Sequence, residues 1–301
     1  MLSAKKIVTL SVSVPTAVAM SQMNIVPVRA SSLTNEFHHF MVAIDGRETL
    51  SFGDYEGLAN PNLNRLTMLY PHFAHDGEDV SSSHFHSIGS YSYTGDVDSP
   101  TVIDTSTNNQ IPEYWTELPP INLVPGTGVF ADSLVNEITA SSEENYNNLK
   151  ITPIQILKNN LDDPAIDAVY NGSDGAWTSS LGDAEIALEL ISITDGLNVA
   201  TQDSTDLFEE VGDTYFIGQG DDFSFTPVFY TDADTNSGNY SAEFRLVDLQ
   251  SNPLPESGRF QINFQVPTQA QVSTPEPSAI ISLISFGFGL PYMYWKRKQR
   301  C

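Results

Sequence analysis

The chain has 301 residues, with 38 acidic and 13 basic side chains and a formal net charge of −25. So acidic a surface repels nucleic acids and anionic lipids and attracts cations, which excludes nucleic-acid binding. The single cysteine, Cys301, is the last residue, so disulfides, thiolate metal sites and cysteine catalysis in the body are also excluded.

Residues 1–30 have the pattern of a secretory signal peptide. Two lysines precede an apolar run at residues 7–20, and Val28-Arg29-Ala30 offers a small-x-small cleavage site, with Ala19 as a second candidate. A permanent membrane anchor is the alternative, but the apolar run is short and is interrupted by serines and a proline. We therefore expect the protein to be exported.

Residues 31–266 are predicted to form an acidic, mainly β domain with an antiparallel β-sandwich-like body and one or two short helices. Alternating or β-rich runs separated by Gly, Asn, Asp and Pro favour this architecture over a βαβ fold. Between residues 31 and 277 the chain keeps six basic and 38 acidic residues, a formal charge of −32. The predicted strands are 37–44, 63–69, 84–93, 185–190, 222–230, 240–249 and 259–266.

One helix is predicted with clear end signals. Asp163 can cap it, Pro164 suits its first turn, and Asn171-Gly172 ends it. Residues 132–140 are predicted as a second helix. Residues 94–128, rich in Thr, Asn, Pro and Gly, are expected to be a long loop or the seam between two subdomains, and 267–277 a polar linker.

All six histidines lie in the part of the domain at residues 37–93. Imidazole is the commonest protein ligand for zinc and copper, so three close pairs in one short stretch indicate a site. The candidate metal ligands are His38, His39, His72, His75, His84, His86 and Asp76.

The spacing of each pair predicts how its rings point. His84 and His86 share one face of a predicted strand, with Phe85 on the other face. The spacing of His72 and His75 suits one side of a helical turn. Only one of His38 and His39 is expected to join a shared site, because they point to opposite faces of an extended chain.

Acidic residues beside the histidines could take part in the site, and the histidines could also have roles that involve no metal. Asp76, Glu78 and Asp79 could be carboxylate ligands or hold the ring N–H groups. Any single pair could instead be a surface feature, and His38 shares its face with buried-type residues, so it could be a core side chain. Zinc is the first choice on ligand type, while copper(II) and nickel also accept imidazole.

A second cation site is considered at an Asp/Asn-rich turn. Asp232, Asp234, Asn236 and Glu243 match the oxygen-ligand spacing of an EF-hand. The glycine falls at the seventh position, Gly238, and both flanks read as strands, so an EF-hand is rejected. A calcium-binding hairpin loop and an ordinary Asp/Asn turn both remain open.

The C-terminus carries a sorting pattern. Pro275-Glu276-Pro277 is followed, in residues 278–301, by an uncharged stretch and the basic cluster 296–300. This order resembles the PEP-CTERM sorting signal, which implies an exosortase-type enzyme as a partner and delivery to the cell surface, periplasm or matrix. An ordinary C-terminal transmembrane anchor is the alternative and predicts no cleavage.

The body resembles a second group, the PEP-CTERM proteins repressed by the zinc-uptake regulator Zur. The segments that carry this resemblance are 70–73, 75–77, 83–89 and 239–248. The resemblance implies a protein made under zinc shortage that buffers or acquires zinc outside the cytoplasmic membrane.

The sequence predicts a zinc-binding surface protein that is not an enzyme. No His-Glu-x-x-His helix is present, and Ser81-Ser82-Ser83 lacks the context of a nucleophile elbow. Expected partners are the metal ion, the sorting enzyme and either an extracellular polysaccharide or a metal-uptake partner. The alternative function is a metal-independent adhesive or structural matrix protein.

Overall fold

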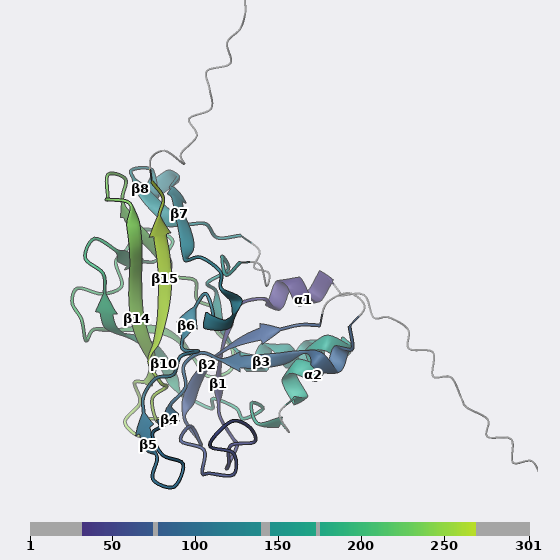
Figure 1. The fold of residues 1–301 in the computed structure, drawn as a ribbon. Coiled ribbons are helices and arrows are strands. Elements are labelled where there is room, and N and C mark those ends of the chain that lie inside the picture. The colour runs from purple at the N-terminus through teal and green to yellow at the C-terminus, as the bar shows by residue number, and fades with distance from the viewer. Residues whose placement is uncertain (1–31, 75–77, 140–144, 173–174, 269–301) are drawn as a thin grey trace, which may run out of the picture.

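The computed structural model describes residues 32–74, 78–139, 145–172 and 175–268. As predicted, these residues form a mainly β, sandwich-like body, in which a large curled sheet lies against a smaller sheet flanked by helices (Figure 1). Within these ranges, no helix is both long enough and apolar enough to cross a membrane. The predicted signal peptide and C-terminal sorting segment lie outside the described residues.

The smaller sheet has four strands in the order β3-β2-β1-β9, of which β2, β1 and β9 are buried throughout and the edge strand β3 is partly exposed. Along β1, Phe40, Val42 and Ile44 enter the core between the two sheets, whereas Met41 and Ala43 enter a second core on the helical side. This alternation explains why every residue of β1 is buried. The strands are β1 Phe40–Ile44, β2 Leu66–His72, β3 His84–Ser87 and β9 Ile151–Pro153.

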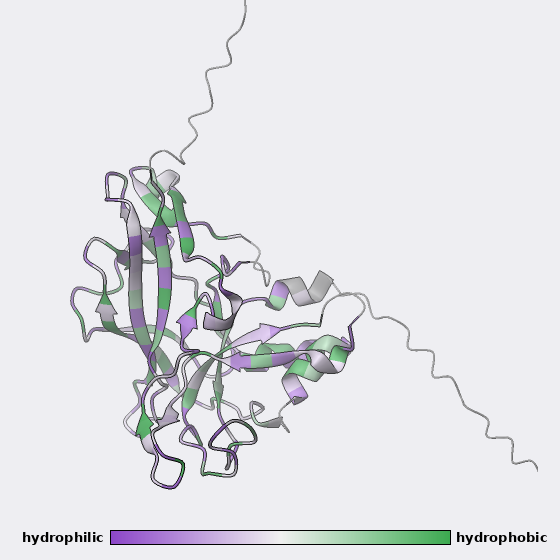
Figure 2. Cartoon of the chain, viewed as in Figure 1, coloured by the Kyte–Doolittle hydropathy of each residue, from purple (hydrophilic) through white to green (hydrophobic). Residues whose placement is uncertain are grey.

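The large sheet has nine strands and runs β11-β13-β8-β7-β15-β14-β10-β12, with β6 also paired to β15. Most pairs are antiparallel, but β6 and β7 run parallel to β15. Apolar and polar residues alternate along β14 and β15, so one face of each strand packs inward (Figure 2). Its strands are β6 Gln110–Ile111, β7 Ile121–Pro125, β8 Ser133–Asn136, β10 Glu185–Ile193, β11 Asn198–Ala200, β12 Thr214–Gln219, β13 Val228–Asp232, β14 Gly238–Asp248 and β15 Phe260–Val266.

The helices cover the outer face of the smaller sheet. Asp163 caps α2 by accepting hydrogen bonds from two backbone N–H groups, and Gly172 follows its end, as predicted. Ile166 and Val169 of α2 then pack into the second core. The helices are α1 Ser32–Phe37 and α2 Pro164–Asn171. The short 3-10 turns are η1 Val80–Ser82, η2 Tyr114–Thr116, η3 Gly128–Phe130 and η4 Ile154–Asn160. Outside both sheets, β4 Ser92–Thr94 and β5 Thr101–Ile103 form a separate hairpin.

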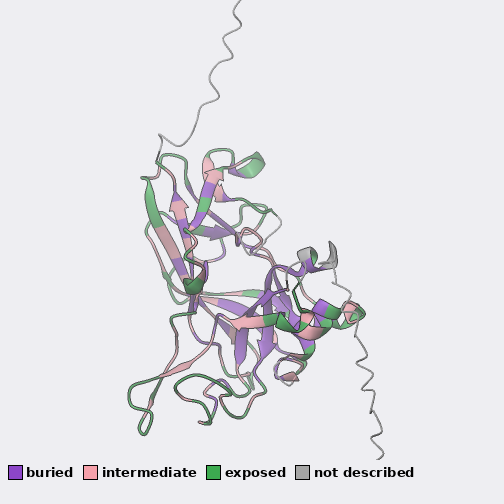
Figure 3. Cartoon of the chain, turned by 45° about the vertical axis from the view of Figure 1, so that its right-hand side comes forward, coloured by how far each residue is buried: buried purple, intermediate pink, exposed green. Residues whose placement is uncertain are grey.

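The main core fills the space between the two sheets; Figure 3 shows that the smaller sheet is mostly buried, whereas the large sheet alternates between buried and more exposed residues and many loops are exposed. Phe229 and Phe264 meet there with ring centroids 4.5 Å apart. The described residues contain no cysteine, so no disulfide links them. Burial of this apolar surface is therefore the dominant contribution to their stability.

Three element predictions are corrected. The strand predicted at 37–44 begins only at Phe40, because Phe37 ends α1. The helix predicted at 132–140 is instead β8, which pairs with β7 and β13. The segment 94–128, predicted as a long loop, contains three strands, two of which belong to the large sheet, while the alternative of a seam between two subdomains stays a prediction.

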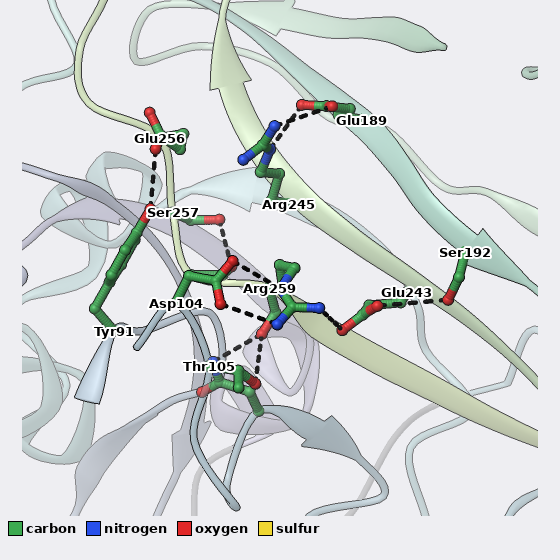
Figure 4. A network of polar contacts seen from close by, with 12 residues as sticks. Tyr91, Asp104, Thr105, Glu189, Ser192, Glu243, Arg245, Glu256, Ser257 and Arg259 are labelled. Carbon is green, nitrogen blue, oxygen red and sulfur yellow. Dashed lines mark hydrogen bonds and ion pairs between the residues drawn. The ribbon is translucent and has the colours of Figure 1, made fainter. Parts of the chain in front are cut away.

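A network of charged side chains ties the hairpin region to the large sheet (Figure 4). Arg259, which directly precedes β15, donates to both oxygens of Asp104 at 2.8 and 2.9 Å and to Glu243 of β14 at 3.3 Å. The hydrogen bonds that Arg259 donates to Asp104 raise the pKa of Arg259 and lower the pKa of Asp104. The forked geometry suits Arg better than Lys.

We expect Arg259→Ala to lower the free energy of unfolding by about 1–2 kcal/mol, since the fork is partly exposed and solvent screens it. Arg259→Lys should recover only part of that loss, because lysine keeps the charge but not the two-pronged contact. Urea unfolding of the three proteins measures this, and equal midpoints would contradict a stabilising role.

Candidate metal centre

Pairing of β3 with β2 gathers three histidines on one face of the smaller sheet. His84 lies opposite His72, and His86 lies opposite Tyr70. Cross-strand partners share a face, so the three imidazoles lie on the side of Tyr70, toward the main core. Phe85 points the other way and packs against the second core. The prediction that His84 and His86 share a face is confirmed.

A glutamate from the large sheet completes the group. Strand β6 is held parallel to β15, with Ile111 beside Ile262, and Glu113 follows two residues later at the start of η2. Only 2% of Glu113 is exposed. A carboxylate buried this deeply requires compensating partners.

Glu113 has three such partners. Its Oε2 lies 2.7 Å from His72 Nε2 and accepts a 2.8 Å hydrogen bond from the Tyr146 hydroxyl, while its Oε1 lies 2.6 Å from His86 Nδ1. One ligand atom each from His72, His86 and Glu113 lies within 4.8 Å of the others. This group could hold a metal ion.

The electrostatics of the group favour an ionised carboxylate. Burial opposes ionisation of Glu113, but hydrogen bonds from His72 and His86 outweigh it and lower its pKa to about 2. Burial and the charge of Glu113 raise the pKa of the Tyr146 phenol, so this hydroxyl stays protonated and donates. A fixed negative charge therefore lies between two imidazoles.

His84 extends the chain of contacts to the surface. Its Nδ1 lies 2.6 Å from the carbonyl oxygen of Ser82, and its Nε2 lies 2.8 Å from Nε2 of His86. A carbonyl only accepts, so Nδ1 of His84 carries a proton. In a neutral His84 ring, Nε2 therefore presents a lone pair to His86.

This arrangement needs one cation beyond neutral imidazoles. A neutral His86 has a single N–H, which can serve either Glu113 or His84. The other nitrogen would then present its lone pair to a second lone pair at 2.6 or 2.8 Å, which is repulsive. A proton or a metal ion has to lie on one of these two contacts.

The centre is accessible from outside. A hollow of about 370 Å³ lies against it, lined by His72, His84, His86, Glu78 and Trp115 among others. The Trp115 ring is 52% exposed and packs edge-on against His72 and His86, with centroids 5.3 and 5.4 Å away. An ion could therefore reach the group without unfolding of the core.

Of the seven predicted ligands, the structure brings His72, His84 and His86 together. His39 is buried elsewhere, with its ring nitrogens 3.0 Å from the Glu36 carbonyl oxygen and 3.1 Å from the Thr152 hydroxyl. The ring of His38 meets that of Phe73 edge-on at 5.0 Å. His75 and Asp76 lie outside the described residues.

Two local expectations differ from the structure. His72 is the last residue of β2 and not part of a helical turn, because its segment pairs with β3. Asp79, expected as a ligand or outer acceptor, caps η1 by accepting from the Ser81 N–H. Sequence reasoning missed Glu113, Tyr146 and Trp115, because no local spacing links them to the histidines.

The four residues considered as calcium ligands lie in different elements of the structure. Asp232 ends β13, while Asp234 and Asn236 lie in the turn before β14. Glu243 lies well inside β14, where its carboxylate contacts Arg259 at 3.3 Å and Ser192 at 3.4 Å (Figure 4). Its engagement there favours the ordinary turn over a calcium loop.

Comparison with known proteins adds no family assignment. No family model matches the chain, and neither curated proteins nor solved structures give a significant match.

Proposed function

We propose that this protein binds one transition-metal ion, with zinc the first choice, through His72, His86 and Glu113. The observation that carries this proposal is the contact set of His86, which needs one additional cation beside a buried carboxylate. Two imidazole nitrogens and a carboxylate oxygen are ligands that zinc accepts, and copper(II) or nickel is the competing choice.

The hydrogen bonds assign a role to each neighbouring side chain. With the ion on Nδ1 of His86, the Nε2–H of His86 can donate to His84, which in turn donates to the Ser82 carbonyl. The contacts from His86 through His84 to Ser82 are then satisfied, whereas the Trp115 indole N–H, which lies 3.1 Å from the same Nδ1, has to turn away to admit the ion. Tyr146 would hold Glu113 in place, and such outer partners set ligand orientation and basicity.

The biological role we propose is buffering or acquisition of zinc by an exported, surface-associated protein. The acidic body would raise the local concentration of cations, and the hollow beside His84 would let an ion exchange. The resemblance to PEP-CTERM sorting signals supports export and processing by an exosortase-type enzyme. We propose binding without catalysis, because no reaction motif accompanies the centre.

Direct zinc titration of the purified protein, monitored by calorimetry and by fluorescence, tests this function. We expect near-stoichiometric binding, with Glu113→Gln and His86→Ala each weakening the affinity by about 100-fold or more, since loss of an outer partner alone costs about 10–100-fold. His84→Ala, which removes an outer partner, should cost about 10-fold.

Asp234→Asn is the matched control for the loss of a carboxylate. Asp234 is exposed in the turn between β13 and β14 and is not a member of the group, so this variant should bind zinc like the unaltered protein. If the unaltered protein binds no zinc, copper or nickel, the metal-independent adhesive or structural function takes the place of this proposal.

A further inference from the structure

A second, larger hollow adjoins the metal centre. It has a volume of about 580 Å³ and shares His84, His86 and Trp115 with the hollow described above. These three side chains therefore form a ridge between the two spaces. The size is typical of a site for a small organic ligand.

The lining of this second hollow, here called the aromatic groove, differs from the rest of the surface. Of its fifteen lining residues none is Asp or Glu, although the chain has 38 acidic residues. Its one Arg, Arg47, is held by Asp45 at 2.9 Å and lies over the Trp177 ring, 4.7 Å from its centroid. The groove thus presents almost no net charge on a strongly acidic molecule.

Aromatic rings and hydroxyl or amide groups replace the missing charge. Five lining residues are Phe, Tyr or Trp, and both tryptophans of the described chain are among them. Phe52 is 74% exposed and Trp115 is 52% exposed, so two ring faces are available to a ligand. Four serines and two asparagines also line the groove; the hydroxyls of Ser87, Ser90 and Ser106 have protein partners but keep further capacity to accept hydrogen bonds.

The uncharged, aromatic lining of the groove suits a sugar better than a cationic peptide or a lipid. A cationic peptide would need acidic side chains in the groove, and a lipid would need aliphatic ones, whereas Leu50 is the single aliphatic lining residue. A sugar ring offers apolar C–H faces that stack on aromatic rings, and hydroxyl groups that pair with Ser and Asn. An uncharged sugar also avoids repulsion from the acidic body.

We infer that the aromatic groove binds a neutral oligosaccharide, with Phe52 and Trp115 as its stacking platforms. Because the groove shares only the ridge residues His84, His86 and Trp115 with the surroundings of the metal centre, this binding does not require the ion. The protein would thereby hold its metal centre against a neutral polysaccharide.

Retention on polysaccharides tests this inference. The purified protein is incubated with microcrystalline cellulose and with chitin, and run through gels containing dextran, xylan or the anionic alginate, all with excess chelator. We expect binding to at least one neutral polysaccharide, and a loss of 10-fold or more in Phe52→Ala and Trp115→Ala. Phe216→Ala, which removes a 50% exposed ring on β12 outside the groove, should bind normally.

Each alternative result overturns the inference. These results are binding to none of the four neutral polysaccharides, retardation by alginate alone, and equal binding by the Phe52 and Trp115 variants. Circular dichroism confirms that both variants fold, which their exposed positions predict. Since chelator is present throughout, a failure here leaves the metal proposal untouched, and the reverse also holds.

Discussion

Saturating zinc is expected to raise the free energy of unfolding by about 4 kcal/mol when its free concentration is ~1000 times Kd. The ligands come from separate sheets, because His72 and His86 lie on the smaller sheet and Glu113 follows β6 of the large one. An ion held by all three would link the sheets and would be released on unfolding. Urea unfolding with zinc and with chelator measures the difference.

Glu113→Gln separates this effect from nonspecific stabilisation by cations. Glutamine keeps the size of the side chain but removes its charge, so the zinc-dependent gain should disappear. Asp234→Asn should retain the full gain, because it only removes a surface charge. Identical unfolding curves of the unaltered protein with zinc and with chelator would show that the centre does not hold the ion.

The histidine face could be predicted because it depends on local spacing. His84 and His86 are two residues apart, so any strand through them places both rings on one side. The edge position of β3 and its register with β2 then add His72, which the sequence assigned to a helical turn. The spacing of His72 and His75 alone could not reveal that His72 ends a strand.

Glu113 could not be predicted, because its position depends on contacts distant in the sequence. It is separated by 41 residues from His72 and by 27 from His86. Its placement follows from the parallel pairing of β6 with β15, about 150 residues further along the chain. The short acidic run after His75 offered closer carboxylates, and local reasoning selected those.

Strand predictions succeeded where alternation was strong. Residues 259–266 alternate along their length and form β15 as Phe260–Val266. The helix predicted at 132–140 failed because its apolar spacing suits either structure, and pairing with β7 and β13 decided for a strand. Tertiary pairing thus outweighed local preference in a short segment.

Acid is expected to destabilise the protein through His39, before carboxylates are protonated. Burial, followed by the charge of Lys150, lowers the pKa of His39 to about 3. The unfolded chain, with an ordinary imidazole pKa near ~6.5, binds the proton more readily. The stabilising contribution of neutral His39 is therefore complete above about pH 6.5 and is lost as the pH falls toward 3.

The expected loss from His39 is about 2 kcal/mol of unfolding free energy at pH 5, relative to pH 8. Glu113 acts in a lower window, since its depressed pKa gives a contribution that is lost only between about pH 4.5 and 2. Unfolding by urea at pH 8, 7, 6 and 5, with chelator to exclude metal release, measures the slope. His39→Gln should be less stable at pH 8 but should show a shallower slope.

Gln155→Leu supplies the matched control, because it also removes a buried polar side chain with several hydrogen bonds. Gln155 donates to the Ser179 and Thr178 carbonyl oxygens and accepts from the Tyr170 hydroxyl, but it does not titrate. Its loss should lower stability equally at every pH. If His39→Gln keeps the slope of the unaltered protein, protonation of His39 is not the cause of the loss of stability in acid.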